Sequence, residues 1–362
     1  MRKKKVLVLS HTGAISHFKI GSHHYASQLA ENGFEVYYSG VPTSMLHRLL
    51  RRHIFGEYKL SKKVHDIRIK SIFPITFKNN YFITSINKLY WKLCENISGG
   101  DQFDIIICDY PFFVPLLSGL NYRSLIYRPT DVYSMMAGDK VKSYEKEIIK
   151  LADKIVCTSN IVKNALIDNY KLENNYKTEI EVLENGYDSD AFYCYPEVNK
   201  NNCVYIGTLD ERFSFEDLLF FSKSFPNVQF DIYGPESKLS KAFSIEYALP
   251  NVSFKGPIAY SLVPGILNNY KVGLLPLNDS SQNKGRSPMK LWEFYSCGLN
   301  VVYTNIDHIK SNIFFKYTSE NKAECFSNAL NYKKDIQKDD ENLIVNTWKY
   351  KTQRLIEIIN AI

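Results

Sequence analysis

One short segment combines a cation, a carboxylate and the residue types that begin and end a helix. Ser287 can cap a helix whose first residue is Pro288, and Gly298 fits the position just past its end. Lys290 then falls in the first turn, where a helix N-terminus favours phosphate. Glu293 follows three residues later on the same face. We interpret the pair as a cation for a diphosphate and a carboxylate for ribose hydroxyls; the alternative is an exposed ion pair on an ordinary helix.

A glycine earlier in the chain suits the same ligand. Gly207 follows an apolar run over 203–206, and a glycine there lets backbone N–H groups approach an anion closely. Thr208 comes next, and Arg212 is within reach of the same place. An ordinary turn between a strand and a helix explains the pattern equally well. Neither G-x-G-x-x-G nor a P-loop occurs, so the fingerprints of simple dinucleotide and ATP binding are absent.

No group of residues has the spacing of a metal site. Four histidines gather in the first loop: His11, His17, His23 and His24. No cysteine or acid completes a tetrahedral set there. Asp188 and Asp190 form a D-x-D run, which we interpret as turn chemistry. The cysteines, 7 in number and without C-x-x-C, argue against disulfides and zinc. We expect a reduced protein with no cofactor and no essential metal.

The composition is typical of a globular protein of two domains. The chain has 362 residues, of which 45% are hydrophobic and 23% charged, and this excludes wholesale disorder. No apolar run reaches the length of a membrane-spanning helix or forms a signal peptide. We therefore expect a cytoplasmic protein.

Short apolar runs alternate with helical patterns, as in parallel sheets buried on both faces. The first predicted strands are 5–10, 35–39, 104–108, 124–127, 154–158 and 179–183, with helices such as 22–32, 141–152 and 160–169 between them. After a polar break at 199–202, further strands are 203–206, 229–233, 252–255, 272–275 and 300–304. Residues 338–362 predict a terminal helix. We predict an α/β protein of two Rossmann-like domains facing a central cleft, 1–197 with the returning helix 341–362, and 198–340.

Four segments resemble GT-B-fold glycosyltransferases. They are the NGYD turn at 185–188, NVSFKGPIAY at 251–260, KVGLLP at 271–276 and PMKLWEFYSCGLNVV at 288–302. The PMKL string is similar to xanthan-type membrane-associated glucuronosyltransferases and to teichuronic-acid glucuronosyltransferases. The resemblance implies a GT-B enzyme that takes a sugar, with glucuronic acid one candidate, from a UDP-sugar or another nucleotide sugar in surface polysaccharide assembly.

The resemblance also implies which residues bind the donor. They are Gly207, Thr208, Arg212, Tyr233, Gly234, Ile258, Tyr260, Ser287, Pro288, Met289, Lys290 and Glu293. Many retaining members of the fold carry a second glutamate eight residues before the position of Glu293, where this chain has Gly285. That signature is therefore incomplete. The xanthan-type enzymes invert, with an aspartate base in the N-terminal half.

The segment YRPTD is similar to the one that bears this base. Asp131 follows a predicted strand and would take the proton of the acceptor hydroxyl. Arg128 would orient it or hold an anionic part of the substrate. Capping of the next turn is the alternative for Asp131, and Asp109 is a rival base. The resemblance places His23 and His24 on the acceptor side, with Arg128; the alternative for the histidines is that they cap the first helix.

The positive charge of the chain is concentrated in one stretch. Lys and Arg number 45 against 38 Asp and Glu, a net charge of +7. Residues 41–98 contain 11 Lys or Arg and 3 Asp or Glu, with aromatic and aliphatic residues between them. This pattern suits an anionic membrane surface and a lipid-diphosphate-linked acceptor, so we predict peripheral membrane contact through 44–78, at the inner face of the cytoplasmic membrane. The alternative is a solvated helix packed on the core. No nucleic-acid-binding motif accompanies the charge.

Three other functions stay open. A nucleotide-sugar epimerase or hydrolase of the same fold needs an acid and a base aimed at the donor sugar. A retaining glycosyltransferase needs no base at Asp131. A non-catalytic polyanion-binding module needs no catalytic residue at all.

Overall fold

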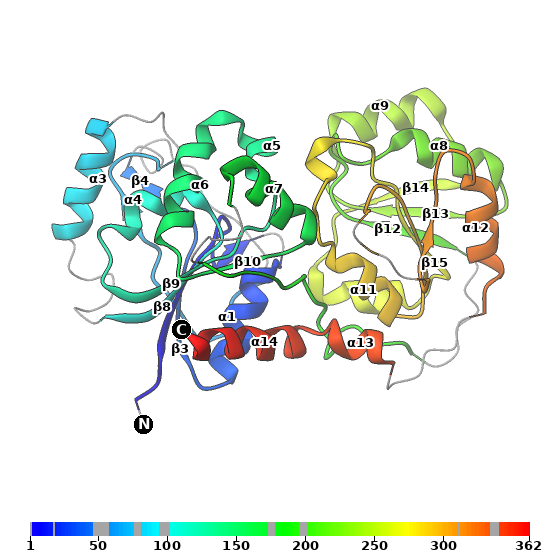
Figure 1. Ribbon diagram of the computed structural model, residues 1–362. Coiled ribbons are helices and arrows are strands. Elements are labelled where there is room, and N and C mark those ends of the chain that lie inside the picture. The colour runs from blue at the N-terminus through cyan, green and yellow to red at the C-terminus, as the bar shows by residue number, and fades with distance from the viewer. Residues whose placement is uncertain are drawn as a thin grey trace. The chain divides into compact units, whose positions relative to one another are not determined.

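The chain folds into two compact units. The computed structural model describes residues 2–16, 19–45, 58–75, 81–93, 102–172, 178–195, 202–307, 309, 312–333 and 340–362. Unit 1 comprises 1–185 and 348–362, and unit 2 comprises 186–347. Each unit is built on its own parallel sheet with helices on its faces (Figure 1).

The sheet of unit 1 has, among the described residues, the strand order β11-β10-β9-β8-β1-β3-β6, with all pairs parallel. Its strands are β1 (Lys5–Leu9), β3 (Glu35–Ser39), β6 (Val64–Asp66), β8 (Phe103–Cys108), β9 (Tyr122–Tyr127), β10 (Lys154–Cys157) and β11 (Ile180–Val182). Short strand pairs add β2 (Ile15–Ser16) with β5 (Tyr58–Lys59), and β4 (Thr43–Ser44) with β7 (Lys70–Ser71). The helices are α1 (Gly21–Glu31), α3 (Tyr81–Leu93), η2 (Pro111–Phe113), α4 (Val114–Leu117), α5 (Tyr133–Ala137), α6 (Asp139–Leu151), α7 (Asn160–Tyr170) and α14 (Trp348–Ala361).

The sheet of unit 2 has the order β14-β13-β12-β15-β16-β17 within the described part of the chain, again parallel throughout. Its strands are β12 (Cys203–Ile206), β13 (Phe230–Tyr233), β14 (Val252–Gly256), β15 (Val272–Leu275), β16 (Asn300–Tyr303) and β17 (Phe315–Lys316). The helices are α8 (Phe215–Ser224), α9 (Lys238–Tyr247), η3 (Tyr260–Leu262), α10 (Val263–Leu267), η4 (Ser281–Asn283), α11 (Met289–Ser296), α12 (Lys322–Asn331) and α13 (Glu341–Val345).

The strand orders locate the candidate ligand sites. In unit 2 the order reverses between β12 and β15, and in unit 1 between β1 and β8. Doubly wound sheets bind ligands at such points, outside the carboxyl ends of the strands. Each predicted strand is present within a residue or two, so the α/β architecture with two Rossmann-like halves is confirmed.

The two segments in which the chain passes from one unit to the other differ from the prediction. The stretch after Asn185 belongs to unit 2, because Tyr187 donates its N–H to the Asn346 carbonyl (2.9 Å) and Phe192 is buried in that unit's core. The single terminal helix predicted over 338–362 is wrong. The Asn346 carbonyl is engaged by Tyr187, and the helix is broken there into α13 and α14.

Of the returning helix predicted over 341–362, α14 belongs to unit 1, whereas α13 belongs to unit 2. Trp348, Leu355 and Ile359 form a buried stripe at helical spacing on α14. This stripe packs on α1, and Figure 1 shows the red helix beside the blue one.

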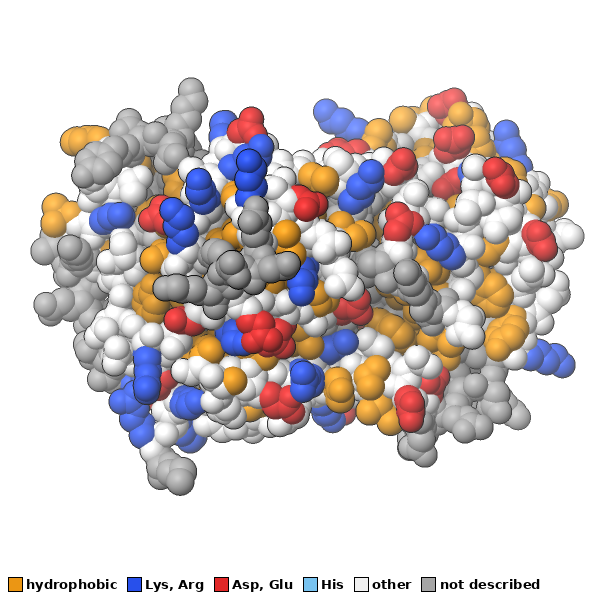
Figure 2. Space-filling view, viewed as in Figure 1, with side chains coloured by type: hydrophobic (Ala, Val, Ile, Leu, Met, Phe, Trp, Pro, Cys, Tyr) orange, Lys and Arg blue, Asp and Glu red, His pale blue; other side chains and the backbone are white. Residues whose placement is uncertain are grey.

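The surface carries charges of both signs. On the face in Figure 2, basic and acidic side chains are interspersed over the described residues, without a field of one sign. No helix in the described ranges is long and apolar enough to cross a bilayer.

Candidate active site

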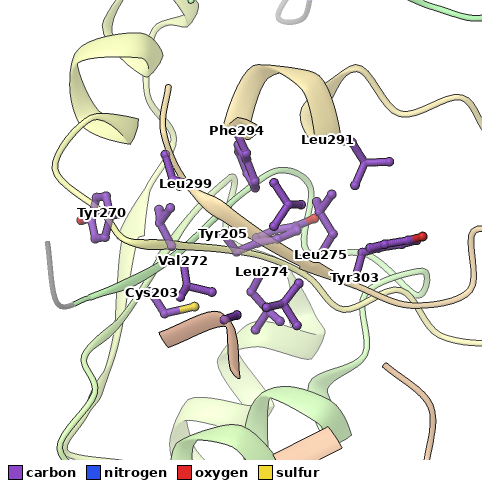
Figure 3. Packing of buried hydrophobic residues seen from close by; sticks show 14 of the residues in the cluster. Cys203, Tyr205, Tyr270, Val272, Leu274, Leu275, Leu291, Phe294, Leu299 and Tyr303 are labelled. Carbon is purple, nitrogen blue, oxygen red and sulfur yellow. The ribbon is translucent and has the colours of Figure 1, made fainter. Parts of the chain in front are cut away.

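The helix with the candidate diphosphate cation is anchored to the sheet of unit 2. Leu291 and Phe294 of α11 are buried, and Figure 3 shows Phe294 pointing from the helix toward the strands. A Cβ on Gly273 of β15 would lie 2.3 Å from the Phe294 ring. Gly273 therefore allows α11 to pack directly on β15, which fixes the direction of its other faces.

The helix begins one residue later than predicted. Pro288 is the N-cap, with an extended ψ of 117°, and Met289 is the first helical residue. The predicted cap at Ser287 is wrong, because the non-helical ψ falls on Pro288. Gly298, with a φ of 90°, follows the end of the helix as predicted. Lys290 remains in the first turn.

Lys290 lies against the glycine turn that ends β12. A Cβ on Gly207 would lie 3.3 Å from Lys290 Cε. The Gly207 N–H donates to the Tyr233 carbonyl at the end of β13 (2.9 Å), and a Cβ on Gly234 would lie 1.9 Å from the Gly207 carbonyl oxygen. Two glycines, the ends of two strands and the first turn of α11 therefore meet at one place, next to the reversal point of the sheet.

Two arginines and two carboxylates act on Lys290. Burial lowers the pKa of Lys290, and nearby Arg286 and Arg212 lower it further, against the opposite effects of Glu293 and Asp210. The site therefore concentrates positive charge in a partly dehydrated place. Such an arrangement suits an anion, whose binding would stabilise the ammonium form of the lysine.

Arg212 is held by its neighbours. Its Nε donates to Asp210 (2.9 Å), and its Nη2 donates to Thr208 Oγ1 (3.2 Å). Burial alone would raise the pKa of Asp210, but the bonds from Arg212 hold it below its ordinary value. Sequence reasoning missed Asp210, although an acid two residues from an arginine could have indicated the pair.

Glu293 is buried one turn below Lys290. The Tyr260 hydroxyl donates to Glu293 Oε1 (3.2 Å), which brings together two residues predicted for the donor. The remaining predicted residues, Ile258 and Met289, are half-buried, and Ile258 packs on the core of unit 2. The donor-side residues therefore stay predictions that share one region of unit 2.

Asp131 follows β9 in unit 1 and is half-buried. Its Oδ2 accepts a hydrogen bond from Thr130 Oγ1 (2.9 Å). It lines a small hollow with the side chains of α6 and α7, among them Glu145 and Asn169. Its place just beyond the carboxyl end of a strand fits the predicted base, and that role stays a prediction.

Arg128 is buried and pairs with Asp109, the rival base, rather than with Asp131. Its Nη1 lies 3.4 Å from Asp109 Oδ2, and its Nη2 donates to Asn185 Oδ1 (2.9 Å). The guanidinium carbon also lies 4.8 Å from the ring centre of Tyr25. Arg128 therefore connects the ends of β8 and β9 to Asn185, after which the chain enters unit 2. Its part in acceptor binding stays a prediction.

The two predicted acceptor histidines are buried at the start of α1. The Ile20 N–H donates to His23 Nδ1 (3.2 Å), and His23 Nε2 lies 2.9 Å from the Gly13 carbonyl, so the proton belongs on Nε2. His23 therefore caps the helix, the alternative considered from the sequence. Burial lowers its pKa to about 4.

His24 packs on the C-terminal helix. Its ring stacks on Trp348 at 4.8 Å between centres, and burial lowers its pKa well below the ordinary value. Both histidines have internal contacts in unit 1, and acceptor contact by either stays a prediction.

The D-x-D run is a turn, as interpreted from the sequence. Asp188 Oδ1 accepts from the Asp190 N–H (3.3 Å), and the Asp188 carbonyl accepts from Ala191 and Phe192. Among the residues that the structure describes, no three His, Cys, Asp or Glu side chains come together as metal ligands would.

Sequence comparison relates the chain to glycosyltransferases. Residues 22–191 match the model of Glycosyltransferase Family 4. A protein of Bacillus subtilis (strain 168), with the provisional name teichuronic acid biosynthesis glycosyltransferase TuaH, is 26% identical over 219 residues. That alignment covers 54% of this chain and 54% of the relative, so the chain spans about half the length of the curated relative it matches. The predicted resemblance to glycosyltransferases is confirmed.

Solved structures show the fold. Sucrose-phosphate synthase from Thermosynechococcus elongatus superimposes with a TM-score of 0.65 at 15% identity, over 99% of this chain and 94% of that one. HepE of Anabaena, solved in complex with UDP and glucose, gives a TM-score of 0.61 at 14% identity, over 99% and 100% of the two chains. The chain therefore has the GT-B fold, as predicted.

Proposed function

We propose that the protein is a glycosyltransferase that moves a sugar from a nucleotide-sugar donor to a hydroxyl acceptor in surface polysaccharide assembly. The observation that carries the proposal is the placement of Lys290 against Gly207, at the reversal point of the unit 2 sheet and close to two arginines. Partly buried positive charge beside a glycine turn suits a diphosphate.

In the proposed reaction, unit 2 holds the donor and unit 1 supplies the base. The acceptor oxygen attacks the anomeric carbon while its proton passes to the Asp131 carboxylate. The bond from that carbon to the phosphate oxygen breaks, and the nucleoside diphosphate leaves with the electron pair. Lys290, Arg212 and the backbone at Gly207 would stabilise its charge, together with the N-terminus of α11, so the chain itself supplies the positive charge.

The proposed donor is a UDP-sugar, with glucuronic acid as the first sugar to test. HepE was solved with UDP and glucose, and the curated relative is named for teichuronic acid biosynthesis. A uronate adds a carboxylate, which Arg286 or Lys284 beside α11 would pair with.

The proposed acceptor is a lipid-linked saccharide at the inner face of the cytoplasmic membrane. Much of the basic stretch, residues 46–57 and 76–80, lies outside the described residues. Its described end is fastened to α3: Asn87 Oδ1 accepts from the Phe73 N–H (2.9 Å), and Trp91 Nε1 donates to the Lys70 carbonyl (2.8 Å).

The outer face of α3 suits a membrane. Phe82 and Leu89, seven residues apart on one face, are 69% and 59% exposed. The helix contains Lys88 and no acid. Exposed apolar side chains beside basic ones fit an anionic bilayer.

The central experiment is the Asp131→Asn variant. We expect it to lose turnover of a UDP-sugar while UDP still raises its melting temperature as in the wild type. NMR of the product should show an inverted anomeric centre. Full turnover in the variant, or a product with the donor's configuration, would rule out Asp131 as the base. Rapid isomerisation or hydrolysis of the donor without acceptor would favour an epimerase or hydrolase.

The membrane proposal has its own test. Leu89→Ser should weaken co-sedimentation with vesicles of anionic phospholipid. Leu262→Ser removes an equally exposed leucine, 59% accessible, from unit 2 and is the matched control. Equal binding by both variants would contradict docking through α3.

A further inference from the structure

A chain of hydroxyl groups leads from Asp131 into unit 1. Thr130 Oγ1 lies 2.9 Å from Asp131 Oδ2 and 3.0 Å from the Tyr133 hydroxyl oxygen. The Tyr133 hydroxyl in turn donates to the backbone carbonyl of Asp109, at the end of β8. The Thr130 backbone is fixed as well, since Thr158 Oγ1 after β10 donates to its carbonyl (2.9 Å).

Counting protons shows that one hydroxyl has two possible acceptors. A tyrosine and a threonine each carry a single hydroxyl proton. The Tyr133 proton goes to the Asp109 carbonyl, so the Thr130 proton can go either to the Asp131 carboxylate or to the Tyr133 oxygen. An ionised carboxylate is the stronger acceptor and takes it.

The preference reverses when Asp131 gains a proton. The carboxylic acid is then a donor, and the nearest acceptor given by the structure is Thr130 Oγ1. Thr130 rotates its own proton to Tyr133, which keeps its bond to the Asp109 carbonyl. Rotation of a single hydroxyl therefore lets the protonated state fill all three links of this chain, whereas the ionised state fills two, the bond from Thr130 to Asp131 and the bond from Tyr133 to the Asp109 carbonyl.

We propose that Thr130 and Tyr133 are positioning residues that hold Asp131 in place and set the pH range over which it accepts a proton, by reversal of the Thr130 hydroxyl. The inference rests on the proposed role of Asp131 as the base.

The surroundings keep the chain intact. Tyr133 is buried, and burial, followed by the charge of Asp131, raises its pKa well above the ordinary value, so it stays protonated. The other charged groups coupled to it are Asp109 and Arg128, which pair with each other, and Glu145 of α6. Glu145 is bound by the hydroxyls of two other tyrosines rather than by Asp131.

The test is the pH dependence of kcat in three variants of the full chain. Thr130→Val removes the donor of the hydrogen bond to the Asp131 carboxylate, which favours the ionised form. The acid limb of the kcat–pH profile should therefore move up by about one pH unit. Tyr133→Phe leaves that donor but removes the acceptor needed by the protonated state, so its acid limb should move down. Thr130→Ser should restore the wild-type profile. Tyr38→Phe, which removes a buried tyrosine hydroxyl of unit 1 that donates to the Thr12 carbonyl, is the control and should not move it.

The inference is supported if Thr130→Val and Tyr133→Phe move the acid limb in opposite directions and Thr130→Ser restores the wild-type profile. Unchanged profiles, or shifts in the same direction, overturn it even if Asp131→Asn has lost turnover. If Thr130→Val does not fold, the direction for Tyr133→Phe decides alone. Full turnover of Asp131→Asn is a different result, because it removes the proposed base itself.

Discussion

Replacing Lys290 by methionine tests the donor site most directly. Methionine keeps an unbranched stem beside Gly207 and removes only the charge. A hydrogen bond to a charged group contributes about 1.5–3 kcal/mol, so the variant should bind UDP about 10- to 150-fold more weakly. The aliphatic part of the side chain at position 290 stays half-buried, and the free-energy cost of burying the Lys290 ammonium group disappears. We therefore expect no loss of thermal stability.

The pH dependence sharpens the test. Burial lowers the pKa of Lys290 in the free protein, and a bound diphosphate favours its charged form. Wild-type affinity should therefore fall as the pH rises through that lowered pKa, while the affinity of the variant stays flat. Titration calorimetry with UDP from pH 7 to pH 10 measures both effects. Lys223→Met, in the last turn of α8, is the control. If both variants bind like the wild type, Lys290 is not a diphosphate ligand.

Three further outcomes follow from packing and burial. Gly234→Ala should abolish UDP binding and lower the melting temperature, since its Cβ would lie 1.9 Å from the Gly207 oxygen; Gly265→Ala, with nothing within 4 Å, should do neither. Trp348→Ala should lower the free energy of unfolding by about 3–5 kcal/mol in guanidinium titration, and a change below 1 kcal/mol would contradict tight docking of α14. His23 has a pKa of about 4 in the fold against 6.5 ordinarily, so the folded state binds fewer protons. Its contribution to the free energy of unfolding, about 3 kcal/mol, is complete above pH 6.5 and is lost as the pH falls towards 4. The melting temperatures at pH 7.5 and pH 5 should therefore differ less for His23→Gln than for the wild type.

The sheets could be predicted because strands buried on both faces are continuous apolar runs. After Asp104 the strand Phe103–Cys108 is an uninterrupted apolar run, and Val272–Leu275 is one throughout. Short edge strands such as Val64–Asp66 and Phe315–Lys316 were missed, since a few residues at a sheet edge carry no such signal. The break near Asn346 was missed because a contact from Tyr187, distant in the sequence, produces it.

The candidate site could be predicted only in part. Lys290 and Gly207 were found from residue type and from their place after strands, and the structure brings them together. Burial could not be predicted, because polarity alone suggests exposure: His23 and Arg128 are 0% and 1% exposed. The bond from Thr130 to Asp131 depends on side-chain torsions, which the order of residues does not reveal.

The missing second glutamate has a structural reason. Gly285 stands eight residues before Glu293, and it is buried with a φ of 80°. Residues with a Cβ rarely adopt that conformation, so a glutamate there would need a different loop between η4 and α11. If the proposed donor sugar lies there, it meets main chain rather than a carboxylate at this position. A reaction whose base is Asp131 needs no carboxylate at position 285. The absence of the glutamate that many retaining members carry there is therefore consistent with the proposed role of Asp131.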